Sequence, residues 1–274
     1  MGKTMKNAHK VSYLFTVALL STVSIEAFAT DDAAELAKKL SNPVADIINM
    51  PFQLNYDNNI GAAENVERNQ LKIQPVIPSK LNEDWNVISR TVLPVIVQQY
   101  DGMDKSTDWG VGDITQSFFF TPTPKSPDDL IIGFGPVIYL PTASEKTLGP
   151  DQYALGPTAV IAKQSHGWTV GALANHLWAV EKKEGAEGIN STFLQPFVNY
   201  TTPTSITYSL NTESTYDWNT DDYTIPVNLT ATKIVKLDKQ LISVGGGFRY
   251  WAHDTDSSAK DFGGRLIASF IFPK

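Results

Sequence analysis

The most constraining feature is a regular series of short segments rich in Val, Ile, Thr, Tyr, Phe and Trp, which begins at Pro51. Polar stretches, Pro and Gly separate these segments, a pattern typical of successive antiparallel strands. Several exceed the average strand of about five to six residues and reach the 9–11 residues that a tilted membrane-spanning strand needs. Twelve strands are predicted, at 51–57, 69–77, 85–100, 109–121, 128–140, 153–163, 167–180, 191–200, 205–216, 223–235, 240–253 and 261–272.

The connections between these strands alternate in kind. One set is short or rich in turn residues, at 78–84, 122–127, 164–166, 201–204 and 236–239. The other set tends to be longer and more polar, at 58–68, 101–108, 141–152, 181–190, 217–222 and 254–260. Outer-membrane barrels have short periplasmic turns and longer loops on the opposite side. An even number of strands then places both chain ends on the short-turn, periplasmic side.

Apolar and polar residues alternate within the strands, most clearly near the C-terminus. In the strand at 240–253, Val244, Phe248 and Tyr250 share one face, and Arg249 lies on the other. A membrane barrel gives this pattern with its apolar face outward. A water-soluble exported all-β protein gives it with the faces reversed, so alternation leaves both alternatives open.

Aromatic residues at strand ends favour the membrane alternative, because aromatic girdles mark the two membrane interfaces. Closure into a barrel also removes the edge strands that an open sheet must protect. The predicted fold is all-β: an antiparallel transmembrane β-barrel of about 12 strands over residues 51–274. The girdle residues are Trp85, Tyr100, Trp109, Tyr139, Tyr153, Trp168, Trp178, Tyr200, Tyr216, Tyr223 and Trp251.

Residues 1–29 have the composition of a secretory signal peptide. Three lysines precede an apolar stretch at 11–23, and Ala27-Phe28-Ala29 provides small residues for cleavage after Ala29. The alternative, a transmembrane anchor, needs about 20 apolar residues, and this stretch is shorter. The sequence therefore predicts export to the cell outer membrane.

Residues 30–50 are predicted to form a short amphipathic helical segment. Ala33, Leu36 and Leu40 share one face, and Glu35 and Lys39 have the i,i+4 spacing of an ion pair. Ser41-Asn42-Pro43 is expected to end the helix. Two interpretations remain open: a periplasmic tail, or a plug at the inner mouth of the barrel.

Composition excludes several classes of function. The formal net charge of −7 is unsuited to nucleic acid, whose binding depends on Lys and Arg contacts with phosphates. The chain has no cysteine, which removes disulfides and thiol chemistry. The three histidines beyond residue 29 lack metal-site spacing, so no metal, cofactor or catalytic residue is predicted.

Ordered short motifs along the mature chain carry a family resemblance. The sequence resembles bacterial outer-membrane proteins grouped as "MetA-pathway of phenol degradation", often described simply as transporters. It departs from the family at 227–230, where a Gly-rich stretch is usual. The resemblance implies an outer-membrane barrel linked to uptake of aromatic or hydrophobic compounds, without an established site. The motifs are Leu40-Ser41-Asn42-Pro43, Pro51-Phe52-Gln53, Trp85-Asn86 with Arg90 and Pro94, Gly110-x-Gly112-Asp113, Gly133-x-Gly135-Pro136, Leu140-Pro141-Thr142-Ala143, Leu155-Gly156-Pro157, Gly171-Ala172-Leu173 with Asn175 and Trp178, Leu194-Gln195-Pro196-Phe197-Val198-Asn199-Tyr200, and Phe272-Pro273-Lys274.

An enzymatic alternative is an outer-membrane lipid hydrolase, because outer-membrane phospholipase is also a twelve-strand barrel with a Ser-His-Asn site on its lipid face. Here Asn175 adjoins His176, and Ser165 precedes His166. Adjacent residues of a strand point to opposite faces, so Asn175 and His176 cannot share one site. The chain is predicted not to be an enzyme.

The predicted function is an outer-membrane channel or transporter for small molecules, possible substrates being aromatic or hydrophobic compounds. A non-conducting structural or binding barrel is the main alternative. Expected partners are outer-membrane lipid, a solute in the lumen and the outer-membrane assembly machinery, but not nucleic acid. Charged and polar lumen groups decide which solutes pass. The candidate lumen-lining residues are Arg90, Asp113, Thr115, Asn211, Arg249 and Arg265.

Overall fold

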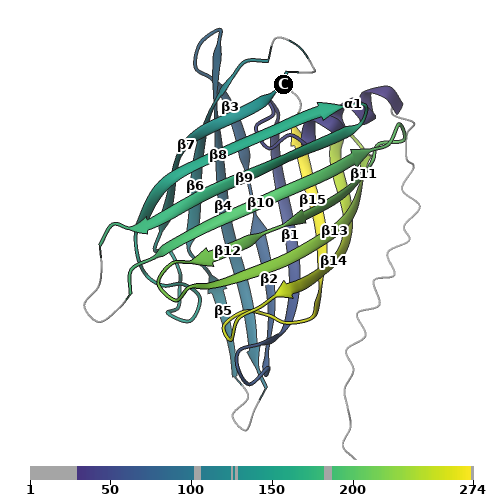
Figure 1. The fold of residues 1–274 in the computed structure, drawn as a ribbon. Coiled ribbons are helices and arrows are strands. Elements are labelled where there is room, and N and C mark those ends of the chain that lie inside the picture. The colour runs from purple at the N-terminus through teal and green to yellow at the C-terminus, as the bar shows by residue number, and fades with distance from the viewer. Residues whose placement is uncertain (1–29, 102–105, 125, 127–128, 182–186, 273–274) are drawn as a thin grey trace, which may run out of the picture.

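The computed structural model describes residues 30–101, 106–124, 126, 129–181 and 187–272, which form a helix and fifteen strands closed into a barrel (Figure 1). The predicted signal peptide and Asp128, the first residue of the fifth predicted strand, lie outside the described residues. The elements are α1 (Thr30–Leu40), β1 (Ile48–Ile60), β2 (Val66–Ile73), β3 (Val76–Lys80), β4 (Trp85–Tyr100), β5 (Ser106–Val111), β6 (Ile114–Pro122), β7 (Ile131–Leu140), β8 (Ala154–Ser165), β9 (Trp168–Ala179), β10 (Asn190–Thr201), β11 (Ile206–Thr212), β12 (Ser214–Asp217), β13 (Asp222–Leu237), β14 (Gln240–His253) and β15 (Phe262–Phe272).

The barrel closes where the first strand pairs with the last. Strand β1 runs antiparallel to β15 from Ile48 opposite Phe272 to Tyr56 opposite Gly264. Every other neighbouring pair is also antiparallel, so the ring continues through β2, β4, β6 and on to β14. All twelve predicted strands are confirmed as the twelve strand positions around this ring, each of which is called a stave below.

Three staves are each interrupted once, which the sequence pattern did not predict. Strand β2 ends before Gln74 and Pro75, and β3 then continues the same stave. Proline has no N–H to donate to the ladder, so an interruption at Pro75 is expected. Gly112 and Asp113 separate β5 from β6, and Glu213 separates β11 from β12. The pairing with β4 changes register between β5 and β6, as at a β-bulge, whereas the ladder resumes in the same register after the other two interruptions.

The connections sort to the two ends of the barrel as predicted. Strands β8 and β9 are joined by His166 and Gly167, whose φ angles of 49° and 86° suit a two-residue hairpin turn. Helix α1 and the start of β1 lie at one end, which is also the end that β15 reaches at Phe272 (Figure 1). This end is called the short-turn end below, and the opposite end the long-loop end.

The two faces of the wall have a polarity opposite to that of a water-soluble protein. On β14, Phe248 is 72% exposed and Arg249 is 6% exposed; on β15, Leu266 is 64% exposed and Arg265 is 3% exposed. Exposed apolar side chains also lie on β1, β7, β8, β10, β11 and β13. An apolar surface this extensive fits lipid rather than water. The transmembrane barrel is therefore confirmed, and the water-soluble alternative is wrong.

Aromatic rings gather on the outer wall towards both ends. The Trp168 and Tyr200 rings lie 4.8 Å apart near the short-turn end, and those of Tyr216 and Trp218 lie 4.8 Å apart near the long-loop end. These positions agree with the predicted girdles.

Three of the predicted girdle residues face inward instead. Trp251 donates a hydrogen bond to the buried Asp57 at 3.1 Å, and Tyr100 packs in the same apolar cluster as Trp251. Tyr139 packs against Val137, which is fully buried. Their rings cover the barrel mouth beneath the loops, because their parity along the strand places them on the inner face.

Helix α1 forms and ends as predicted. Lys39 and Glu35 form an ion pair of 3.0 Å, and the hydrogen bond from Lys39 lowers the pKa of Glu35. The chain turns after Leu40 because Ser41 donates through both its N–H and its hydroxyl to the Ala37 carbonyl. Asn42 then accepts a bond from the Val44 N–H at 3.0 Å. Within the described residues, no helix is long and apolar enough to cross a membrane.

Candidate functional site

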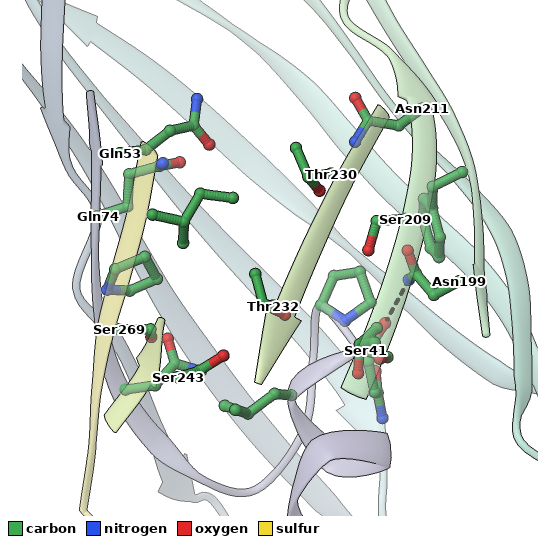
Figure 2. A pocket seen from close by; sticks show the side chains of 18 of the residues that line it. Ser41, Gln53, Gln74, Asn199, Ser209, Asn211, Thr230, Thr232, Ser243 and Ser269 are labelled. Carbon is green, nitrogen blue, oxygen red and sulfur yellow. Dashed lines mark hydrogen bonds between the residues drawn. The ribbon is translucent and has the colours of Figure 1, made fainter. Parts of the chain in front are cut away.

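A polar cavity of about 290 Å³ lies inside the barrel towards its short-turn end (Figure 2). Its wall comes from β1, β3, β4, β9, β10, β11, β13, β14 and β15, with α1 and the residues after it along one side. Most of the lining side chains carry a hydroxyl or an amide: Ser41, Asn42, Asn49, Gln53, Gln74, Gln195, Asn199, Ser205, Thr207, Ser209, Asn211, Thr230, Thr232, Ser243 and Ser269. Three charged residues, Arg90, Glu213 and Arg265, complete the polar set.

Residues 41–47, called the inserted segment, lie within the barrel mouth next to this cavity. Val44 is 5% exposed and packs with Val76, Ile88, Phe119 and Val160 on one side of the barrel. These partners belong to β3, β4, β6 and β8.

The inserted segment also contacts the other side of the barrel. Ala45 and Ile47 pack with Ile234, Leu241 and Ile271, which belong to β13, β14 and β15. One short stretch of chain therefore crosses the mouth and touches both walls. Of the two interpretations of residues 30–50, this packing agrees with a plug.

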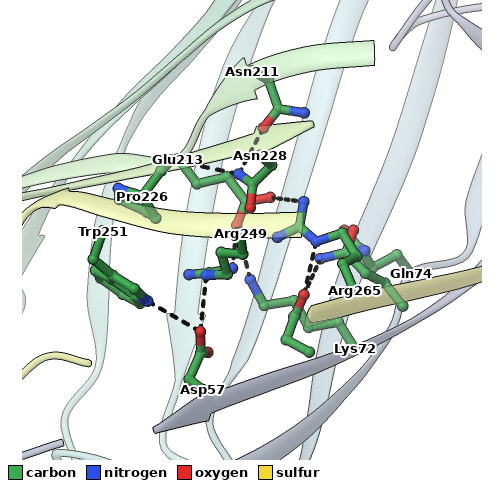
Figure 3. A network of polar contacts seen from close by, with 12 residues as sticks. Asp57, Lys72, Gln74, Asn211, Glu213, Pro226, Asn228, Arg249, Trp251 and Arg265 are labelled. Carbon is green, nitrogen blue, oxygen red and sulfur yellow. Dashed lines mark hydrogen bonds and ion pairs between the residues drawn. The ribbon is translucent and has the colours of Figure 1, made fainter. Parts of the chain in front are cut away.

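An ion-pair cluster lies beyond the cavity, with Glu213 at its centre (Figure 3). Glu213 lies 2.8 Å from Nη1 of Arg265, 3.4 Å from Nζ of Lys72 and 3.5 Å from Nη1 of Arg249. Arg249 in turn lies 3.1 Å from Asp57. These five residues define the cluster, and their side chains are mostly buried.

The cluster bridges the lumen rather than following one stretch of wall. Glu213 sits at the interruption between β11 and β12, and Lys72 lies on β2, five staves away around a ring of twelve. The Glu213 N–H donates to the carbonyl of Pro226 at 3.1 Å, beside a register shift in the pairing of β13 with β14. The register is the same before and after Glu213, so its strand parity, shared with Asn211, directs the carboxylate inward, where it narrows the barrel.

Neutral side chains complete the hydrogen bonding around the cluster. Nε of Arg265 donates to Asn55 at 2.8 Å, and Asn228 donates to Asn211 at 2.9 Å. The Arg249 guanidinium also lies 4.7 Å above the Trp251 ring, a cation–π contact. The described cluster is thus held in place on several sides.

The structure brings four of the six candidate lumen residues together. Arg90, Asn211 and Arg265 line the cavity, and Arg249 belongs to the ion-pair cluster beside it. Nη2 of Arg90 donates to Oε1 of Gln74 at 3.0 Å.

The other two candidate residues lie away from the cavity lining. Asp113 is buried against the loop between β7 and β8, where it accepts a hydrogen bond from the Ala143 N–H at 2.8 Å. Thr115 lies on β6 opposite Val92 on one side and Tyr139 on the other. Asp113 therefore anchors a loop.

Sequence reasoning missed Glu213, Lys72 and Asp57, the partners of the predicted arginines. The sequence did indicate an inward side chain at Glu213, because Glu213 has the same strand parity as Asn211. Strand parity also indicates the direction of Asp57, which lies at the end of a predicted strand. What the pattern could not reveal is that Lys72 on β2, Glu213 between β11 and β12, and Arg249 on β14 meet across the lumen.

The described residues show no arrangement that matches the enzymatic alternative. Asn175 and His176 are adjacent on β9, and Nδ1 of His176 contacts the Thr192 hydroxyl at 2.7 Å. Ser165 and His166 contact each other at 2.7 Å at an exposed turn. Nor do three His, Asp or Glu side chains gather as a metal site within that part of the chain.

No family model matches the chain, and no curated protein matches it in sequence. Among solved structures it is similar to a COG4313 outer membrane channel from Pseudomonas putida F1, with a TM-score of 0.67 and 14% identity over 83% of this chain and 96% of that chain. It is also similar to NanC porin, with a TM-score of 0.49 and 9% identity over 81% and 98% of the two chains. For KdgM porin in complex with disordered oligogalacturonate the TM-score is 0.46, with 11% identity over 83% and 99%. The chain thus shares the barrel fold of the Pseudomonas channel.

Proposed function

We propose that this chain is an outer-membrane channel for small molecules. The observation that carries the proposal is the polar cavity enclosed by a wall whose outer face is apolar. A barrel that served only as an anchor would need no polar cavity beside its axis. Twelve strands are intermediate between barrels of eight, which side chains about fill, and wide pores of sixteen to eighteen.

The channel is closed at its short-turn end in this conformation. The inserted segment occupies the mouth, and the ion-pair cluster narrows the lumen beyond the cavity. Transport then requires the inserted segment to move, because Val44 and Ile47 pack against opposite walls of the barrel. The channel is therefore gated rather than permanently open.

Export and membrane context belong to the same proposal. The signal peptide, cleaved after Ala29, directs the chain across the inner membrane, and the outer-membrane assembly machinery inserts the barrel. Outer-membrane lipid then surrounds the exposed apolar side chains, and the short-turn end faces the periplasm. Aromatic or hydrophobic solutes, implied by the resemblance, fit this polar lining less well than hydrophilic ones.

Single-channel recording of the refolded full chain in planar bilayers tests the proposal. We expect discrete conductance steps separated by long closed periods, because the inserted segment must leave the mouth before ions pass. Slower gel migration after boiling would establish folding, since an unfolded sample also gives no steps. Folded, inserted protein without steps at any voltage would contradict the channel.

A second candidate is a non-conducting structural barrel, which the two obstructions in the lumen favour. The structural barrel predicts that displacing the inserted segment leaves the bilayer insulating. The channel predicts that the same change raises conductance. The two candidates therefore differ in one measurable outcome.

A further inference from the structure

The ion-pair cluster and the neighbouring cavity lining together carry an excess of positive charge, although the whole chain has a formal net charge of −7. The cluster contains three cations, Lys72, Arg249 and Arg265, for two carboxylates, Asp57 and Glu213. Arg90 adds a fourth cation that lines the cavity. In a confined, poorly hydrated space this excess attracts anions more strongly than it would in bulk water.

Two arginines of the cavity lining have donors that no described hydrogen bond takes up. Arg90 donates to the neutral amide of Gln74 at 3.0 Å, and Glu213, whose charge also acts on Arg90, is already contacted by three other cations. Arg265 is 3% exposed, and its Nη2 has no hydrogen-bond partner among the described atoms. A guanidinium carries five N–H donors in a planar fork, which matches the geometry of a carboxylate.

The remaining polar wall suits hydroxyl groups. Asn199, Ser209, Asn211, Thr230 and Thr232 project towards one space, opposite Gln53 and Gln74 (Figure 2). Hydroxyl and amide side chains both donate and accept hydrogen bonds, as the hydroxyls of a polyol do. The cavity of about 290 Å³ is near the lower end of the range for ligand sites, about 300–1,000 Å³, so the ligand is small.

We propose that the cavity binds a small polyhydroxylated carboxylate, such as a sugar acid. Its carboxylate contacts Arg90 and the free donor of Arg265, and its hydroxyls lie along the Ser, Thr and Asn side chains of β11 and β13. This inference rests on the proposed channel and names the class of solute that the channel takes. It replaces aromatic or hydrophobic compounds with a hydrophilic anion.

Equilibrium binding to the folded full chain in detergent tests the inference without requiring the channel to open. Isothermal titration with potassium D-gluconate, D-glucose and sodium benzoate compares three probes on the same protein. Glucose lacks the carboxylate, and benzoate lacks the hydroxyls. We expect gluconate to bind at least tenfold more tightly than either, because a charge-assisted hydrogen bond adds about that factor.

The same titration with gluconate is repeated on the variant Arg90→Gln and on its matched control, Lys239→Gln. Both changes remove one positive charge, but Lys239 is exposed in the turn between β13 and β14. We expect Arg90→Gln to weaken gluconate binding about tenfold and Lys239→Gln to leave it unchanged. Boiling-dependent gel migration of each variant establishes folding, and the comparison of probes on the unmodified chain stands even if a variant fails to fold.

Each other result overturns the inference. Equal binding of glucose and gluconate would remove the role of the carboxylate, and tighter binding of benzoate would identify an aromatic acid instead. No binding of any probe would mean that the cavity is not a ligand site. None of these results decides whether the barrel conducts, so failure here is distinguishable from failure of the proposed channel.

Discussion

Replacing Glu213 with Gln is expected to destabilise the barrel by about 3 kcal/mol, because it leaves the three buried cations of the cluster with Asp57 as the one carboxylate of the cluster. Lys72, Arg249 and Arg265 all contact this carboxylate within 3.5 Å, so three cations would face one another across the lumen. Urea titration of the folded protein in detergent, followed by tryptophan fluorescence, measures the change in unfolding free energy.

Glu64→Gln is the matched control for Glu213→Gln. Glu64 forms an ion pair of 3.0 Å with Lys260 at the long-loop end, and its hydrogen bond raises the pKa of Lys260. Glu64 is exposed and Lys260 is partly exposed, and ion pairs near the surface contribute little to stability. We expect the control to unfold as the unmodified chain does. Equal effects of the two substitutions would mean that Glu213 does not organise the lumen.

Replacing Val44 with Asp is expected to raise the open fraction of the channel about a hundredfold. The new carboxylate would lie among Val76, Ile88, Phe119 and Val160 without a described cation in that cluster. Burying an unpaired charge costs several kcal/mol, and each 1.4 kcal/mol is a factor of ten in an equilibrium. The inserted segment relieves this cost by leaving the mouth, which single-channel open times measure.

Lys38→Asp introduces the same side chain at an exposed position of α1 and serves as the control. We expect its open times to match those of the unmodified chain. If Val44→Asp inserts and folds but stays closed, the inserted segment is not what closes the barrel.

The inserted segment packs on both walls through apolar side chains. Polar contacts from the wall to α1 and the inserted segment include Gln164 to the Lys38 carbonyl at 2.7 Å and Asn199 to the Ser41 carbonyl at 3.5 Å. Neither contact belongs to a strand ladder. The segment can therefore leave while the ring of paired strands remains intact, as expected of a locally unstable element.

Local patterns predicted the wall of this protein well. Strand length, turn residues and alternation act over a few neighbours, so they identified all twelve staves, although the turn predicted at 164–166 lies at His166 and Gly167. The interruptions were missed because a single Pro or Gly within an otherwise continuous strand does not reveal whether the ladder resumes on the same stave.

The interior was harder to predict because its contacts depend on closure. Alternation placed Arg249 and Arg265 inward, but their meeting with Glu213 joins strands far apart around the ring. The role of Val44 and Ile47 was also ambiguous, because a few apolar residues after a helix fit a tail or a plug equally. The inward aromatic residues Tyr100 and Trp251 had the strand-end position of girdle residues and differ only in parity.

The absence of native cysteine allows a direct test of the central claim, that the inserted segment gates a conducting barrel. Val44 and Val160 belong to one apolar cluster, and a methyl group of each lies within 3.3 Å of where a Cβ of residue 133 would stand, so a cross-link between cysteines at 44 and 160 would tie the inserted segment to β8. We would record single-channel conductance of Val44→Cys/Val160→Cys under reducing and oxidising conditions, with each single variant as a control. The gated channel predicts conductance steps when the pair is reduced, none when a gel confirms the cross-link, and recovery on reduction. Steps that persist through the cross-link would contradict the gate, and their absence from folded, reduced protein would contradict the channel.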